Sequence, residues 1–173
     1  MPEVDAFMGV DQITEVPRIV REAISCRSAK TTVSHEKRSR VENFSKPLAE
    51  VSVRPQYVPD VDTPRFRLTS RHFAYVKIAE GCNHPCSFCI IPRMRGSHRS
   101  RQQLDIVREA KGLISQGVKE LNLISQDSTY YGMDLRPSHR RTISSPQKFA
   151  LAAETLPENA TTLSSLLREL SGI

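Results

Sequence analysis

The sequence has 173 residues, of which 38% are hydrophobic and 6% aromatic, with no tryptophan. This length suits one ordinary domain, and the composition is lean for a large core. No apolar run approaches the roughly 20 residues that a membrane span needs, which predicts a soluble protein. The 25 basic and 19 acidic residues leave a net charge of +6, which suits an anionic partner as well as it suits an ordinary solvated surface.

Residues 1–27 predict one strand followed by one helix. A short apolar run at residues 4–8 forms the strand, Thr14 is a suitable N-cap, and Pro17 fits the first turn of the helix. Apolar residues then recur at helical spacing at Val16, Ile19, Val20, Ala23 and Ile24. The N-terminus lacks the features of a targeting peptide, so we expect a cytoplasmic location and no membrane association.

Residues 28–67 predict a linker between this piece and a second domain at residues 68–173. The linker is polar and basic without a sustained period, and its prolines rule out one continuous element. Residues 65–68 (Arg-Phe-Arg-Leu) alternate in polarity, which predicts a short edge strand.

A convincing strand at residues 73–79 leads into a loop with three cysteines. Cys82, Cys86 and Cys89 have the spacing C-x3-C-x2-C. Thiolates are soft ligands that suit iron–sulfur clusters and zinc. Three of them can hold three irons of a cubane cluster and leave the fourth iron open, whereas a closed electron-transfer cluster has four. The spacing therefore indicates a reaction centre.

Two other interpretations of the cysteines stay open. A disulfide pair with a spare thiol is the weaker one, because close cysteines in an intracellular protein more often bind metal. Structural zinc is the stronger competitor, with His84, His72 or His98 as the fourth ligand. Zinc loops usually come in two halves, and the sequence has no second half.

A helix and a second strand follow the cysteine loop. Ser100 and Gln103 predict a capping box, an apolar stripe runs to Ile114, and Gly117 fits the glycine that ends a helix. Residues 118–125 predict a strand parallel to the first one, which makes a βαβ unit.

Gln126 and Asp127 emerge from the second strand at the same edge as the cysteines. They are either ligand contacts or turn caps. Beyond them, residues 133–160 predict an irregular insertion, and residues 162–170 resume a helical pattern.

The cysteine spacing, with Phe88 before the last cysteine, resembles the radical S-adenosylmethionine superfamily. Residues 75–83 (Tyr-Val-Lys-Ile-Ala-Glu-Gly-Cys-Asn) and 89–92 (Cys-Ile-Ile-Pro) resemble its methylthiotransferase family. Residues 124–132 (Ile-Ser-Gln-Asp-Ser-Thr-Tyr-Tyr-Gly) are similar to the branch that methylthiolates an aspartate of ribosomal protein S12. The tRNA-modifying branch usually carries a Gly-Gln-Asn-Val-type segment there. The resemblance spans residues 1–135 and is best over 59–132.

The resemblance implies an α/β fold, with the first part of a radical S-adenosylmethionine partial (βα)6 barrel preceded by the last βα unit of an N-terminal methylthiotransferase domain. It implies that Cys82, Cys86 and Cys89 hold a [4Fe–4S] cluster whose open iron binds S-adenosylmethionine. Phe88 would lie against the adenine, with Gln126 and Asp127 as further cofactor contacts. Implied partners are ribosomal protein S12 or the ribosome, and an electron donor such as flavodoxin or ferredoxin.

Two departures from the family pattern affect the expected activity. The family's N-terminal domain carries three further cysteines for a second [4Fe–4S] cluster, and none of them lies in this sequence. Only two βα units of the barrel are visible. We therefore expect a fragment that keeps the ligands for radical initiation. The alternatives are a tRNA methylthiotransferase and an inactive, truncated metal-binding remnant.

Overall fold

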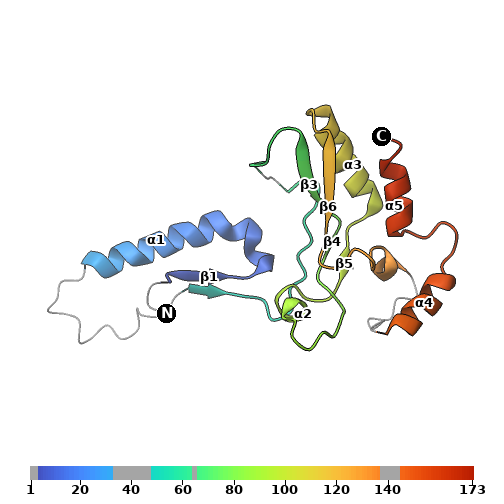
Figure 1. Ribbon diagram of the computed structural model, residues 1–173. Helices are drawn as coiled ribbons and strands as arrows, with labels where there is room; N and C mark the ends of the chain where they lie inside the picture. The colour runs from blue at the N-terminus through green and yellow to red at the C-terminus, as the bar shows by residue number, and fades with distance from the viewer. Residues whose placement is uncertain (1–3, 33–47, 64–65, 137–144) are drawn as a thin grey trace. The chain divides into compact units, whose positions relative to one another are not determined.

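The computed structural model describes residues 4–32, 48–63, 66–136 and 145–173 (Figure 1). These form two compact units, Met1–Pro55 and Gln56–Ile173. No helix in the described ranges is long and apolar enough to cross a membrane.

The first unit is a small parallel strand pair with a helix. Its elements are β1 (Ala6–Met8), the 3-10 helix η1 (Val10–Glu15), α1 (Val16–Thr32) and β2 (Leu48–Glu50). β1 pairs with β2 in parallel, with Ala6 opposite Leu48. Among its residues whose side chains are described, only Ile19 and Pro55 are buried, so this unit has a very small core.

The first unit confirms the predicted strand and helix but differs in their limits. The helix begins at Val16 because the 3-10 turn η1 takes up Thr14, which therefore does not act as the N-cap. The predicted linker 28–67 also contains regular structure, since α1 runs to Thr32 and β2 pairs with β1. Local periodicity could not reveal β2, because its partner lies about forty residues earlier in the chain. The assignment of 1–27, 28–67 and 68–173 as domains stays a prediction.

The second unit holds the predicted βαβ arrangement. β3 (Phe73–Lys77) and β6 (Glu120–Ile124) pair in parallel, with Phe73 opposite Glu120, and α3 (Gln103–Ser115) connects them. Its other elements are β4 (Ala79–Glu80), α2 (Ile91–Met94), β5 (Arg99–Ser100), η3 (Met133–Leu135), α4 (Pro146–Glu154) and α5 (Leu163–Leu170).

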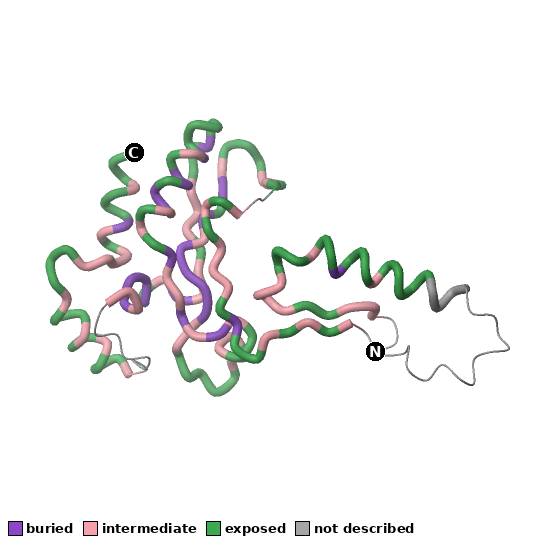
Figure 2. Tube along the Cα trace, turned by 180° about the vertical axis from the view of Figure 1, so that it is seen from behind, coloured by how far each residue is buried: buried purple, intermediate pink, exposed green. Residues whose placement is uncertain are grey.

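The core of the second unit lies between the two parallel strands and the helices α3 and α5. Buried residues follow the strands and the inner side of α3 in Figure 2. Val76, Ile78, Ile106 and Leu166 are fully buried there. This is the packing expected where helices cover one face of a parallel sheet.

The start of α3 differs from the prediction. Ser100 does not cap the helix, because it belongs to β5, which pairs antiparallel with β4. The N-cap is Gln102, which makes no side-chain capping bond. At the other end the prediction is confirmed, since Gly117 follows the helix with φ of 91°.

The last third of the chain contains more helix than predicted. α4 lies inside the segment 133–160 and is capped by Ser145, whose hydroxyl accepts a hydrogen bond from the amide of Lys148. α5 confirms the predicted final helix and begins with a capping box between Thr162 and Ser165. The predicted edge strand at 65–68 is not formed in its described part, residues 66–68.

Candidate functional site

The cysteine loop, residues 81–98, joins β4 to β5 at the carboxyl end of the parallel strands. The amide of Ile78 donates to the carbonyl of Ile124 at 3.0 Å, so the chain enters the loop beside the end of β6. Gly81 has φ of 79°, and a Cβ there would lie 2.2 Å from the carbonyl oxygen of Ser97. Only glycine fits this position without strain, because its backbone is left-handed and the backbone of Ser97 passes close to it.

The base of the cysteine loop is closed by hydrogen bonds and charges. The amide of Cys82 donates to the carbonyl of Gly96 at 3.2 Å. The buried carboxylate of Glu80 lies 2.5 Å from the ammonium of Lys77 and 3.5 Å from the guanidinium of Arg95. A buried carboxylate requires such partners, so Glu80 links the residues before and after the cysteines.

The three cysteines are free thiols on this loop. Cys82 and Cys89 are half-buried and Cys86 is exposed. The amide of His84 donates to the sulfur of Cys82 at 3.4 Å, and the amide of Cys89 donates to the carbonyl of Cys86 at 3.1 Å. Burial raises the pKa of the Cys82 thiol, the hydrogen bond from His84 lowers it, and the charge of Asp127 raises it further.

The three cysteines offer the type of ligand that iron–sulfur clusters use. They are three soft sulfur ligands on one accessible loop. Among the residues that the structure describes, no group of three or more His, Cys, Asp or Glu side chains is placed so that it could hold a metal ion. Metal sites often form only with their metal, so the loop would adjust on loading.

The histidines considered as a fourth zinc ligand have other surroundings. His98 is buried, and its Nε2 lies 3.2 Å from the hydroxyl of Ser100. His72 immediately precedes β3, at the opposite end of the strand from the cysteines. His84 lies on the loop itself, with its Nε2 3.0 Å from a carboxylate oxygen of Asp127.

The other predicted site residues lie at or beside the loop. Phe88 is 91% exposed, so its ring packs against little of the protein. The side-chain oxygen of Gln126 accepts a hydrogen bond from the amide of Gly81 at 2.9 Å. Asp127 is buried and accepts a hydrogen bond from the hydroxyl of Thr129 at 2.7 Å. The structure therefore brings Gln126 and Asp127 to the loop, as the strand order predicted.

Sequence reasoning missed a second group of residues behind the loop. The amide of His98 donates to the side-chain oxygen of Asn83 at 3.0 Å, and the imidazole stacks edge-on against Tyr130. The hydroxyl of Ser100 donates to Asp134 at 2.5 Å and accepts from the amide of Gly132 at 2.9 Å. The partners lie roughly thirty residues apart in the chain, so no local pattern pointed to them.

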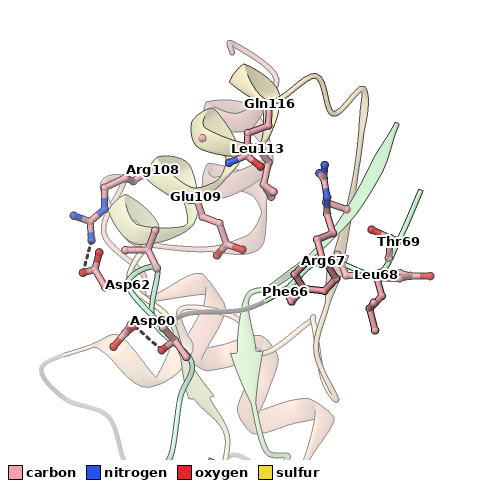
Figure 3. A pocket seen from close by; sticks show the side chains of 15 residues that line it. Asp60, Asp62, Phe66, Arg67, Leu68, Thr69, Arg108, Glu109, Leu113 and Gln116 are labelled. Atoms are coloured by element: carbon pink, nitrogen blue, oxygen red, sulfur yellow. Dashed lines mark hydrogen bonds and ion pairs between the residues drawn. The ribbon is translucent and has the colours of Figure 1, made fainter. Parts of the chain in front are cut away.

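A cavity of about 480 Å³ lies away from the cysteine loop. It is formed by residues 60–63 and 66–69, the first half of β3 and one side of α3, and Figure 3 shows Arg108 paired with Asp62 at its rim. It adjoins the amino-terminal half of β3, so it is separate from the edge where the cysteines lie.

Comparison with known proteins defines the class of this site. The Radical SAM superfamily matches residues 76–161, a range that includes the cysteine loop and β6. The chain therefore belongs to the radical S-adenosylmethionine superfamily. Membership implies a [4Fe–4S] cluster and S-adenosylmethionine as cofactors, in agreement with the sequence analysis.

Similarity to curated proteins narrows the family. A protein of Opitutus terrae is 47% identical over 99% of this chain, and one of Akkermansia muciniphila is 46% identical over the whole of this chain. One of Syntrophus aciditrophicus is 39% identical, again over the whole chain. All three are named ribosomal protein uS12 methylthiotransferase RimO, and the chain belongs to this methylthiotransferase family. It spans about a third of the length of these relatives, from 30% to 33%.

Proposed function

We propose that the chain carries the radical-initiating site of a methylthiotransferase that acts on an aspartate of ribosomal protein uS12. The observation that carries the proposal is the position of the three free cysteines. They lie on one loop at the carboxyl end of two parallel strands, within the range that matches the superfamily. Loops at this end of parallel strands form the reactive mouth of α/β barrels. The names of the relatives support the substrate.

The residues that form the cysteine site and close its loop have the following parts in this proposal. Cys82, Cys86 and Cys89 would hold the cluster, and the exposed ring of Phe88 is available to lie against the adenine. When bound, the cluster and S-adenosylmethionine supply the one-electron chemistry that removes a hydrogen atom from an unactivated carbon. Gly81 and Glu80 shape and close the loop that presents the thiols.

Anaerobic reconstitution with iron and sulfide tests the cofactor part of the proposal. We expect about four irons per chain and an electron paramagnetic resonance signal that changes when S-adenosylmethionine is added. Replacing Cys82, Cys86 or Cys89 by alanine should abolish stable iron binding. Cys26→Ala is the matched control, because Cys26 is an exposed thiol in the other compact unit. Bound zinc, or iron that survives loss of a loop cysteine, would contradict the proposal.

The substrate is tested separately by adding candidate partners to the reconstituted chain. Chromatography measures the cleavage of S-adenosylmethionine to 5′-deoxyadenosine and methionine. We expect this cleavage to require Cys82. We expect uS12 or small ribosomal subunits to stimulate the cleavage and tRNA to leave it unchanged. The reverse preference would assign the chain to tRNA modification. Flavodoxin or ferredoxin with its reductase serves as the electron donor in both assays.

A further inference from the structure

Two consecutive residues after β6 attach to two points of the cysteine loop. The side-chain oxygen of Gln126 accepts the amide of Gly81, directly before the first cysteine. The carboxylate of Asp127 lies 3.0 Å from the imidazole of His84, between the first and second cysteines. Gln126 and Asp127 lie two and three residues after Ile124, the last residue of β6, so they are anchored at the end of the paired strands.

The surroundings of Asp127 favour an internal role. Only 6% of its side chain is exposed, whereas half of the His84 side chain is exposed. A carboxylate this deeply buried needs donors or a positive charge nearby. One of its oxygens accepts from Thr129, and the other faces His84 in a contact that lacks the alignment of a hydrogen bond. This 3.0 Å contact therefore joins the exposed part of the loop to the residues that follow β6.

Gln126 gives a second, independent attachment. The amide of Gly81 lies at the beginning of the loop and has no helix or sheet partner, so the Gln126 side chain satisfies it. An unsatisfied buried amide is costly, and Gly81 is buried. The loop is thus held both at its first residue and between its first two cysteines.

We propose that Gln126 and Asp127 are positioning residues that hold the cysteine loop in place against the end of β6, with His84 as the partner of Asp127. This deepens the proposed function and rests on it for its consequence, the stability of the loaded cluster. It also departs from the sequence-based expectation that the two residues contact the cofactor. Their polar atoms already meet loop atoms in the protein itself.

The first test uses the metal-free chain. The alkylation rates of the cysteines are measured by mass spectrometry in wild type, His84→Ala, Asp127→Ala and the double variant. We expect the half-buried Cys89 to react roughly three- to tenfold faster in each single variant, the range that the loss of one net interaction adds to a local opening equilibrium. The double variant should be no faster than the singles, because both remove the same contact. Gln126→Ala should give a similar, additive acceleration.

The controls separate loop opening from general effects. Cys26 reports the intrinsic reactivity of an exposed thiol in every sample. His72→Ala removes an exposed histidine at the far end of β3 and should leave all rates unchanged. If Asp127→Ala loses its circular dichroism signal, Asp127→Asn keeps the shape of the side chain and removes its charge, and the same rates decide the question.

The second test uses the reconstituted chain. Iron loss to a chelator should be faster by a similar factor in His84→Ala and Asp127→Ala, while the spectral change on adding S-adenosylmethionine is retained. Unchanged alkylation and iron loss would overturn the proposal. Loss of the spectral change at unchanged alkylation rates would also overturn it and would assign the residues to cofactor contact. A wild-type chain that binds no iron would refute the proposed function and leave the alkylation comparison valid.

Discussion

At the scale of single residues, the cysteine loop depends on one backbone conformation. Gly81 has φ of 79°, and an added Cβ would meet the carbonyl oxygens of Ser97 and Gly96 at 2.2 and 2.5 Å. We expect Gly81→Ala to lower the free energy of unfolding by about 2–4 kcal/mol, because it adds left-handed strain to a steric clash with backbone. Urea denaturation followed by circular dichroism measures the change.

The matched control for Gly81 is Gly112 in α3. A Cβ at Gly112 meets nothing within 4 Å, and the residue lies inside a helix. Gly112→Ala should therefore raise the free energy of unfolding by about 1 kcal/mol. Equal effects of the two substitutions would show that the loop adapts to a side chain at Gly81.

Ser100 shows how a single side chain joins distant parts of the chain. Its hydroxyl connects β5 to Asp134 and to the amide of Gly132. Ser100→Ala removes the acceptor of the buried Gly132 amide and one of the two bonds to Asp134, whose other oxygen still accepts from the Ser100 amide. It should destabilise the protein by about 1–3 kcal/mol in the same urea titration. Ser115→Ala is the control, because its exposed hydroxyl bonds only to the helix carbonyl of Gly112, and its effect should stay within about 0.5 kcal/mol.

At the scale of elements, the sequence predicted what local periodicity encodes. The parallel strands at 73–77 and 120–124, the helix ending at Gly117 and the helix after Thr162 are confirmed. The two-residue strands β4 and β5 are too short to show alternation, and this is why Ser100 resembled a helix cap. The cysteines could be found by spacing alone. Their attachments to β6 and to His98 could not, because those depend on long-range packing.

Leu166 is the most deeply buried residue of α5, with Leu163 and Leu170 packed against the same core. Leu166 is fully buried against the core, whereas its neighbour Leu167 is 48% exposed. Leu166→Ala should cost about 2–5 kcal/mol, since it removes buried methyl groups and leaves a cavity. Leu167→Ala should change the stability by less than about 1 kcal/mol, because alanine and leucine have similar helix propensities. A comparable loss from both variants would mean that α5 is not docked as described.

At the scale of the whole molecule, the net charge of +6 overstates the positive surface near the cysteines. Several basic residues of the second unit already have partners inside it. These are Lys77 and Arg95 with Glu80, Arg99 with three backbone carbonyl oxygens, Arg101 with Glu109, and Arg108 with Asp105 and Asp62. A count of charges along the sequence cannot separate such paired residues from those that face solvent.

The exposed Arg93 on α2 is the basic residue best placed to meet an anionic partner, because it lies four residues after the third cysteine on the same loop. If the partner is the small ribosomal subunit, its affinity should fall as salt rises, since phosphate contacts release counterions. Arg93→Gln should weaken the binding and reduce the slope of log affinity against log salt by about 0.9, the value for one phosphate contact.

Arg108→Gln provides the comparison at equal net charge. Arg108 is also exposed, but Asp105 and Asp62 already neutralise it, so its loss should change the slope much less. Fluorescence anisotropy over a salt series would measure both variants. If the two slopes fall equally, the binding responds to total charge rather than to the surface beside the cysteine loop. If only Arg93 matters, the partner approaches the edge of the sheet where the cysteines lie.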